Sequence, residues 1–268
     1  MTNIIKVLTS ITLALTLTLA GAADNSIYVD QAGDNSTVTM TQDGAGNIIR
    51  GIQGVGTSNT TPAIIRGDGN QVIVSQIGSS NTLNLGIRTS QANGVNGGNN
   101  FIYSVTGSNS TANINSNNTG TGISASNNIT VRQTGNQSNA DIDVLGTANN
   151  ITAITSGGAQ NSVVLKQNGD NNIQNITLSG GGSNSATITQ GDSVNTSTGS
   201  TATVTSNGGN NSFIIAQYGG LNGHNATVDV VGNANSINIM QQGTSADNVA
   251  NIKSVGATNT FVINQNTH

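Results

Sequence analysis

Few residues in this chain carry side chains that could take part in acid–base or nucleophilic chemistry. Its only histidines are His224, in a glycine-rich segment, and His268, and we expect both to be solvated. Asp141 and Asp143 alternate with apolar residues, so on a β-strand both carboxylates would share the outward face. A carboxylate pair could act in hydrolysis, but no Glu or His accompanies this one. We therefore predict no catalytic residues and no enzyme activity, and expect the two charges to limit lateral sheet association.

Glycine-rich segments could serve ligand binding instead. SGGGSN, SNGGNN and GVNGGNN have the composition of calcium-binding β-roll turns. That motif places Asp at a fixed offset in successive turns, whereas these segments carry mostly Asn, which supplies only neutral oxygens. No helical sequence follows the glycines, which argues against a phosphate-binding loop. We expect no metal ion and no cofactor.

Threonine-rich segments offer a third surface chemistry. TVTMT starts at Thr37, TIT at Thr187 and TATVT at Thr201, and outward Thr rows of this kind could bind ice. Equivalent outward positions elsewhere hold Asp, Lys and Ile, and threonine is also simply a good strand former. A monomeric extracellular adhesin or ice-binding protein remains the alternative function.

A short repeat must position all these residues. In many units Asn precedes two alternating apolar residues and then Gln, as in Asn211, Phe213, Ile215 and Gln217. A period of two indicates a β-strand with the apolar residues and Gln on one face. The density of Gly, Asn and β-branched residues argues against a helix. Gly and Asn tolerate positive φ, so their clusters after each Gln predict a reversal of chain direction.

Units that end in Gln alternate with units that end in Gly or Ser. From Gln167 to Gln265 the intervals between successive glutamines of the repeat are 23, 27, 24 and 24 residues, so one rung contains two strands. Two strands cannot bury an apolar face alone, but stacked rungs can. We predict an all-β fold, a two-sheet β-solenoid of about 20 strands in about 10 rungs, roughly 48 Å long at the ordinary strand spacing. Its stacking would be amyloid-like cross-β.

Amide side chains are expected to form rows along this solenoid, each donating to the next. The predicted stacking glutamines are Gln31, Gln42, Gln53, Gln76, Gln133, Gln167, Gln190, Gln217, Gln241 and Gln265. The predicted turn and ladder asparagines are Asn25, Asn35, Asn47, Asn70, Asn81, Asn161, Asn172, Asn184, Asn211, Asn235 and Asn259.

The glutamines fall into two phases of the repeat. Those in the first phase are Gln31, Gln53, Gln76 and Gln133. Val105 takes the glutamine position between the last two, and from Gln167 onward the other phase applies. The row is therefore expected to cross from one sheet to the other near residues 145–160.

The N-terminal residues indicate in which cellular compartment the protein acts. The run VLTSITLALTLTLA after Lys6, followed by Ala20 and Ala22, predicts a cleaved secretory signal peptide at residues 1–22. A membrane anchor would need a longer and less Thr-rich run. Residues 23–268 are predicted to form a single β-solenoid domain without a transmembrane segment, with irregular repeats near 82–127 and 185–210.

Charge and cysteine content argue against nucleic-acid binding and exclude stabilisation by disulfides. The 7 basic residues include Lys6, so removal of the signal leaves six against 11 acidic residues, all Asp, a formal charge of −5. Nucleic-acid binding needs clustered Lys and Arg and is not expected. An exported chain with no Cys must gain its stability from something other than disulfides.

The repeat resembles that of the curlin family of bacterial amyloid fibre subunits, whose units carry Ser/Asn-x5-Gln-x-Gly-x3-Asn-like motifs. The matching segments are QDGAGN (42–47), QIGSSN (76–81), QNGDNN (167–172) and QYGGLN (217–222). The resemblance covers nearly all of the mature chain. It implies a secreted subunit that polymerises into extracellular, cell-surface fibres for adhesion and biofilm matrix. It also suggests two partners, a nucleating minor subunit and an outer-membrane secretion pore.

The two ends of the repeat region favour self-association. NSIYVDQ at its start and NTFVINQ at its finish obey the core pattern without interruption, and no capping sequence is evident. Terminal rungs of this kind expose unpaired backbone N–H and C=O groups. The sequence therefore predicts a homopolymer that grows head to tail.

Overall fold

A computed structural model describes residues 24–54, 57–88, 98–116, 124–192, 196–219, 223–243 and 246–267. These residues form strands and turns, and no α-helix occurs among them. In this part of the chain no helix is long and apolar enough to cross a membrane.

The strands belong to two sheets, of 9 and 13 strands. The 9-stranded sheet contains β3 (Thr37–Asp43), β6 (Gln71–Ile77), β8 (Asn100–Thr106), β11 (Asn128–Thr134), β13 (Asn150–Ser156), β15 (Ile173–Gly180), β17 (Thr201–Gly208), β19 (Asn225–Val231) and β21 (Val249–Val255). The 13-stranded sheet contains β1 (Ser26–Ile27), β2 (Val29–Ala32), β4 (Ile48–Arg50), β5 (Ala63–Arg66), β7 (Thr82–Arg88), β9 (Thr111–Ser116), β10 (Ser124–Ala125), β12 (Asn139–Thr147), β14 (Ser162–Asn168), β16 (Ser185–Gln190), β18 (Ser212–Gly219), β20 (Ser236–Gly243) and β22 (Thr260–Thr267).

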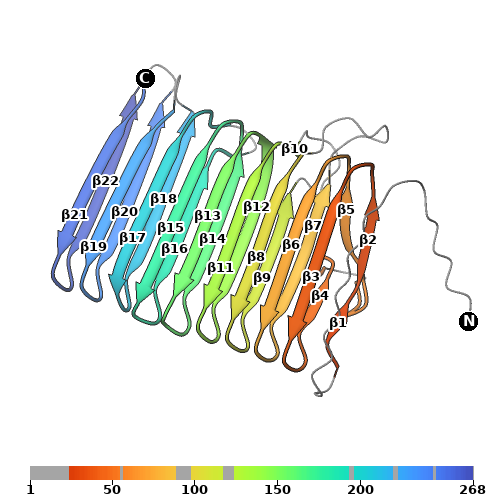
Figure 1. The fold of residues 1–268 in the computed structure, drawn as a ribbon. Coiled ribbons are helices and arrows are strands. Elements are labelled where there is room, and N and C mark those ends of the chain that lie inside the picture. The colour runs from red at the N-terminus through yellow and green to blue at the C-terminus, as the bar shows by residue number, and fades with distance from the viewer. Residues whose placement is uncertain are drawn as a thin grey trace, which may run out of the picture.

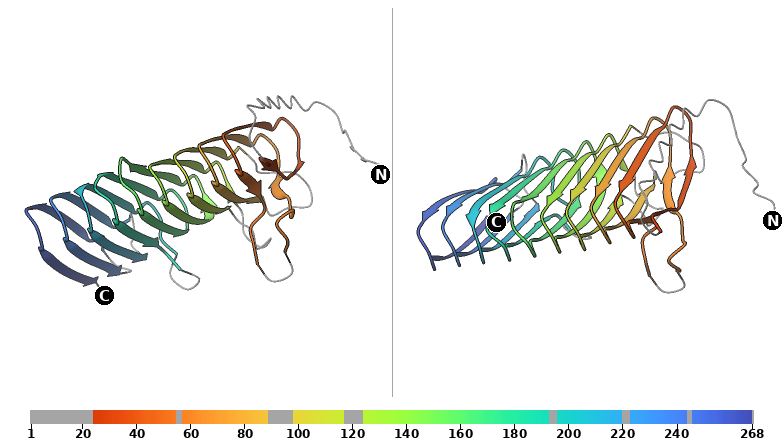
Figure 2. Two further views of the ribbon diagram at one scale, coloured as in Figure 1. Left: turned by 90° about the horizontal axis from the view of Figure 1, so that it is seen from below. Right: turned by 60° about the horizontal axis from the view of Figure 1, so that its bottom comes forward.

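Successive rungs stack in chain order, and each strand pairs in parallel with its counterpart in the next rung (Figure 1). In the 13-stranded sheet, β1–β2, β4–β5 and β9–β10 are each one interrupted strand, so the described strands of this sheet form 10 levels. The predicted all-β, two-sheet solenoid is confirmed. The two views of Figure 2 show the rungs following one another along a single axis.

Alternate residues of every strand face the space between the sheets and form one continuous core. Because the pairing is in register, each inward position becomes a column of equivalent side chains. One such column of the 13-stranded sheet holds Leu83, Ala112, Ala140, Val163, Ala186, Phe213, Ile237 and Phe261. Burying a Val, Leu or Ile side chain stabilises the fold by roughly 1.5–3 kcal/mol, and no residue can gain this without its neighbours above and below.

An insertion interrupts the second level of the 13-stranded sheet. The described residues between β4 and β5, 51–54 and 57–62, lie outside the sheet, and the N–H of Gly51 donates to the carbonyl of Thr61 at their base (2.8 Å). These described residues project away from the stack (Figure 2). Pro62 immediately precedes β5, where its missing N–H removes no bond from the strand.

Glycines stack at the turns that follow the 9-stranded sheet. Gly44, Gly78, Gly107 and Gly135 all have positive φ, and each lies directly against the next. A Cβ added at Gly107, whose φ is +140°, would lie 2.0 Å from the carbonyl oxygen of Gly135. The glycine of Gln-x-Gly is therefore required by the close approach of successive rungs.

We predict that Gly107→Ala destabilises the fold by about 2–5 kcal/mol, because both backbone strain and a steric overlap are introduced. Gly54→Ala is the matched control, since an added Cβ there meets nothing within 4 Å. Urea unfolding followed by circular dichroism measures both variants. Equal stabilities would contradict the steric role of the row.

Candidate functional site: amide ladders and open ends

Five glutamines form an uninterrupted row inside the 13-stranded sheet. The Nε2 group of each donates to the Oε1 atom of the next, at 3.1, 2.8, 2.9 and 2.8 Å. The members in order are Gln167, Gln190, Gln217, Gln241 and Gln265. The second N–H of the amide crosses the core, as in the 3.0 Å bond from Gln217 to the carbonyl of Thr201 in the opposite sheet. The row thus ties rungs to one another and the two sheets together.

The row has a direction. Its first acceptor, Oε1 of Gln167, is buried without a hydrogen-bond partner, because Val144 occupies the preceding position of the column. At the other end Gln265 donates to the carbonyl of Val249 (3.0 Å) and accepts from Gln241. The remaining N–H of its amide has no partner among the described residues and lies at the C-terminal end of the stack.

A shorter row lies in the 9-stranded sheet. Gln42 donates to Gln76 (2.8 Å), and its own Oε1 is buried without a partner. Val105 interrupts the row as expected, and the hydroxyl of Tyr103 instead donates to Oε1 of Gln133 (2.8 Å). Tyr103 is completely buried, and desolvation raises the pKa of its phenol well above the usual range.

The predicted assignment of early glutamines to one phase is partly wrong. Gln76 and Gln133 do lie in the 9-stranded sheet, but the other glutamine of their column is Gln42, which pairs with Gln76. Gln31 lies in the 13-stranded sheet, opposite Ile65. Gln53 belongs to no column, because it falls in the insertion 51–62 and bonds locally to Gly51.

The crossing of the row between sheets does occur. Thr155 follows Gln133 in the 9-stranded column, and the next long row begins at Gln167 in the other sheet. Sequence reasoning also missed Gln174, an inward residue that donates to the carbonyl of Lys166 and whose Oε1 has no partner.

Turn side chains form a second kind of ladder beside the 13-stranded sheet. The Oδ1 atom of Asn47 accepts the backbone N–H of Asn81 (3.0 Å), and its Nδ2 donates to the carbonyl of Gly78 (2.8 Å). This links the Asn and Gly of the motif between adjacent rungs. The column contains Asn25, Asn47, Asn81, Ser110, Ser138, Asn161, Asn184, Asn211, Asn235 and Asn259.

An equivalent ladder lies at the other turn. Its members are Ser36, Asn70, Asn99, Asn127, Asn149, Asn172, Ser200, His224 and Asn248. Asn35 was predicted here, but it is exposed with a φ of 53°, and the buried residue is Ser36. Most ladder residues directly follow a residue with positive φ, so turn geometry rather than Asn itself marks the position.

His224 differs most from its expected environment. It is 1% exposed, and its Nδ1 accepts the backbone N–H of Asn248 (3.0 Å). Its Nε2 lies 3.0 Å from the carbonyl of Tyr218. A neutral imidazole with its proton on Nε2 makes both bonds and so replaces a ladder asparagine. The prediction that His224 is solvated is therefore wrong, and His268 lies outside the described residues.

Asp141 and Asp143 lie on the outer face of β12, as expected. Asn115 donates to Asp143 (2.9 Å), and Lys166 is its in-register neighbour. Partial desolvation on the sheet surface raises the pKa of Asp143, and the charge of Asp141 adds to this. The hydrogen bond from Asn115 and the charge of Lys166 act in the opposite direction. Among the described residues no group of three or more potential His or Asp metal ligands occurs.

The threonine segments do not share one surface. Thr39 and Thr203 face outward from the 9-stranded sheet, whereas Thr187 faces outward from the 13-stranded sheet. An ice-binding lattice would need them on one face, so this arrangement does not favour that function.

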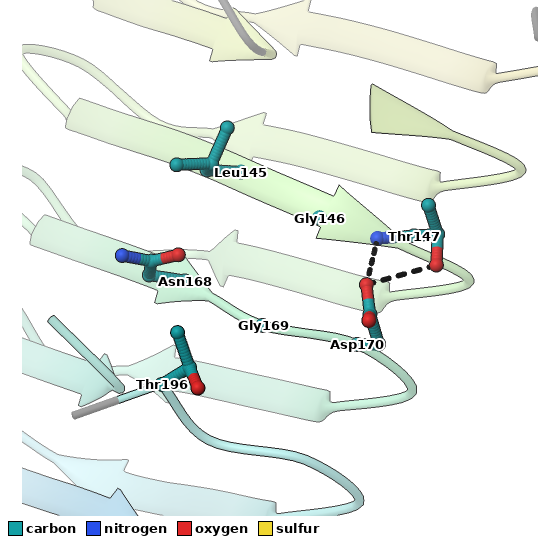
Figure 3. Close-up of a pocket in the computed structure, with 7 residues that line it drawn as sticks. All are labelled: Leu145, Gly146, Thr147, Asn168, Gly169, Asp170 and Thr196. Atoms are coloured by element: carbon teal, nitrogen blue, oxygen red, sulfur yellow. Dashed lines mark hydrogen bonds between the residues drawn. The ribbon is translucent and has the colours of Figure 1, made fainter. Parts of the chain in front are cut away.

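A cavity of about 430 Å³ opens beside the ends of β12 and β14 (Figure 3). Its polar wall includes Asp170, whose Oδ1 accepts the backbone N–H (2.6 Å) and the hydroxyl (2.8 Å) of Thr147. Gly146 and Gly169 contribute backbone only. The Oδ1 atom thus joins two turns of the stack, as the ladder side chains do.

The fold and its ladders define a class, a parallel two-sheet β-solenoid with internal rows of amide side chains. Comparisons with protein-family models, curated proteins and solved structures find no match.

We predict that Gln217→Leu lowers the free energy of unfolding by about 1–3 kcal/mol, because it leaves buried amide groups of its neighbours without partners. Gln71→Leu makes the same change at an exposed position of β6 and is expected to alter stability by less than about 0.5 kcal/mol. Urea unfolding measures both. Similar losses in the two variants would argue against the row as a source of stability.

In the turn ladder that contains His224, we predict that His224→Ala lowers the free energy of unfolding by about 1–3 kcal/mol, because the buried N–H of Asn248 loses its acceptor. His224→Asn restores the side chain found at most other levels and should recover most of that loss. Thermal unfolding at neutral pH distinguishes the two. If both variants are equally destabilised, the imidazole has a role other than that of a ladder amide.

Proposed function

We propose that this chain is a secreted structural subunit that polymerises head to tail into extracellular, curli-like fibres for cell-surface adhesion and biofilm matrix. The observation that carries the proposal is the chemical match between the two ends of the stack. The export step rests on the leader at residues 1–22, which lie outside the described part of the chain.

The C-terminal end exposes the edge and part of the core. β22 is the last strand of its sheet, and no described strand pairs with its outer edge. Its inward residues Phe261 and Ile263 are only partly buried. Val255 of β21 and Val262 of β22 are 71% and 64% exposed. β22 contains no charged residue and no proline that would discourage strand addition.

The N-terminal end presents the same columns. Following the register through the sheet, Phe261 lies in the column of Ile27, and Ile263 in that of Val29. Gln265 lies in the column of Gln31. A second copy placed on the C-terminal end, in continuation of the stack, would therefore set apolar residues on apolar residues and amide on amide.

Hydrogen-bond polarity agrees with this placement. The spare N–H of Gln265 faces the position where Oε1 of a neighbour's Gln31 would lie, and Gln31 uses only its Nε2, toward Gly33. A single end-to-end contact between two copies would then give a partner to the spare N–H of Gln265 on one copy and to Oε1 of Gln31 on the other. In the other sheet Ser254 lies in the column of Gln42, whose buried Oε1 lacks a donor.

The first test is seeded growth of residues 23–268 diluted from denaturant, followed by thioflavin fluorescence and electron microscopy. We expect a lag phase that seeds remove, and unbranched fibres. A folded β-rich chain that stays monomeric at high concentration would overturn the proposal.

Val262→Pro tests the end contact directly. Ser236 N donates to Asn259 O, so the alternation of a parallel ladder turns the N–H of Val262 away from β20. Proline there removes no internal bond but blocks strand addition. We expect this variant to fold, to fail to polymerise and, at substoichiometric amounts, to arrest one end of wild-type seeds. Val262→Thr keeps the N–H and should polymerise normally, whereas normal growth of the proline variant would place the contact elsewhere.

A further inference from the structure

The two sheets do not have the same number of levels. The described strands of the 13-stranded sheet form 10 levels, whereas the 9-stranded sheet has one level for each of its 9 strands. The first and last of the described strands, β1 and β22, both belong to the 13-stranded sheet. This sheet therefore projects beyond the other at both ends of the stack.

Burial at the two ends agrees with this difference. The inward residues Met40 of β3 and Ile252 of β21 are only 2% and 7% exposed, although both strands are terminal in their sheet. The inward residues Ile27 of β1 and Phe261 of β22 are only partly buried. The projecting strands thus cover the ends of the 9-stranded sheet and lack a cover of their own.

Head-to-tail stacking leaves a gap in the 9-stranded sheet. When β22 pairs with β1–β2 of a second copy, the 13-stranded sheet continues at the ordinary spacing of about 4.8 Å. No described strand follows β21 in its sheet, so β21 and the β3 strand of the second copy then lie two spacings apart, about 9.6 Å. Bringing these two strands closer would place β22 and β1–β2 at the same level. We name this gap, which has room for one strand, the open strand position.

Backbone groups of both neighbouring strands point into the open strand position. In a parallel ladder, alternate residues of a strand bond to the strand on one side and the remaining residues to the strand on the other. The N–H of Asn225 donates to the carbonyl of Asn248 (2.8 Å), so Asn248 is one of the residues that bond toward β19. The N–H and C=O groups of Asn251 therefore point away from β19. The same alternation on β3 directs those of Met40 away from β6, because Thr37 bonds toward β6.

Side chains at the same edges lack partners that an added strand would supply. Oε1 of Gln42 is buried without a donor. Ser254 lies in the same column, accepts from Nδ2 of Asn259 (3.0 Å) and retains its own hydroxyl hydrogen. A glutamine between the two would accept from Ser254 and donate to Gln42. Asn248 is the last residue of its turn ladder, and no described residue donates to its Oδ1.

We propose that the open strand position binds one extended segment of a separate polypeptide, which runs parallel to β21 and carries Asn, two apolar residues and Gln at alternate positions. Its Asn would continue the turn ladder from Asn248, its apolar residues would continue the core columns, and its Gln would bond to Gln42. Strand addition of this kind obtains affinity from main-chain hydrogen bonds and specificity from alternate side chains.

A second copy does not supply this strand, because each described strand of the chain is already paired within its own stack. The inference rests on the head-to-tail polymer proposed above and names a partner for it.

A synthetic peptide with the sequence of residues 127–134, NNITVRQT, is the probe, because Asn127, Ile129, Val131 and Gln133 provide the required pattern. The chain of residues 23–268 is polymerised from seeds with an excess of the fluorescently labelled peptide, and the peptide content of the sedimented fibres is measured. We expect about one peptide per subunit, since each junction has one open strand position. The same peptide with Val131→Pro should be incorporated at least about tenfold less, because proline removes a ladder N–H.

Asn251→Pro blocks the open strand position from the side of the protein. It removes an N–H that points into the gap and leaves β22, where the two copies meet, unchanged. Seeded growth should keep its wild-type rate, while the peptide content of the fibres falls at least about tenfold. Asn251→Thr keeps the N–H and should incorporate the peptide as the wild type does.

The outcomes separate the two proposals. Fibres that exclude the unmodified peptide would overturn the open strand position and leave head-to-tail growth intact. Equal uptake of the two peptides, or undiminished uptake by Asn251→Pro fibres, would show that the peptide binds elsewhere and would also overturn the inference. Absence of any fibre would overturn the polymer and the open strand position with it.

Discussion

The strand spacing of about 4.8 Å is the constraint on which the whole structure depends. Every rung repeats the previous one at this distance, so a polar group in the interior can be satisfied only by chemistry that itself repeats. Glutamine meets this requirement because its amide both donates and accepts, and Gln190 accepts from Gln167 while donating to Gln217. Valine at position 144 cannot do so, and the orphaned Oε1 of Gln167 shows the consequence of breaking the repeat.

The same spacing determines the turns. Successive turns approach too closely for a side chain at the glycine position, and the turn carbonyls and N–H groups must bond between rungs. The side chain of Asn47 makes both kinds of bond, to Gly78 and to Asn81. Serine and histidine occupy the same positions at some levels because what is needed is an acceptor of one backbone N–H. His224 supplies it through Nδ1 and Ser200 through its hydroxyl.

Periodicity is why so much of the fold could be predicted. Alternation and turn spacing specify strands, inward faces and stacking without any long-range information, and the long glutamine row from Gln167 follows directly. Assigning residues to sheets from the spacing of the repeat fails where extra residues are inserted between strands. Because of the insertion between β4 and β5, Gln53 lies outside the strands. For the same reason Gln31 and Gln76 lie in different sheets, Gln31 in the 13-stranded sheet and Gln76 in the 9-stranded sheet. Asn35 and His224 show a second limit, because composition alone cannot distinguish the left-handed residue of a turn from the buried residue that follows it.

A structure stabilised by repeating one rung along an axis has no intrinsic end. An interior rung receives its hydrogen bonds and apolar contacts from the rungs on either side, so a terminal rung lacks half of them. Globular proteins close such edges with helices, charges or proline, and none of these covers β22 in the described part of the chain. Because all columns run the full length of the stack, the groups missing at one end are those presented at the other. The amide match that we propose between Gln265 and Gln31 is more specific, because Ile65, Ile87, Ser116 and Val144 occupy the same column between Gln31 and Gln167. It depends on the residue types at the two ends and not on an unbroken row of glutamines.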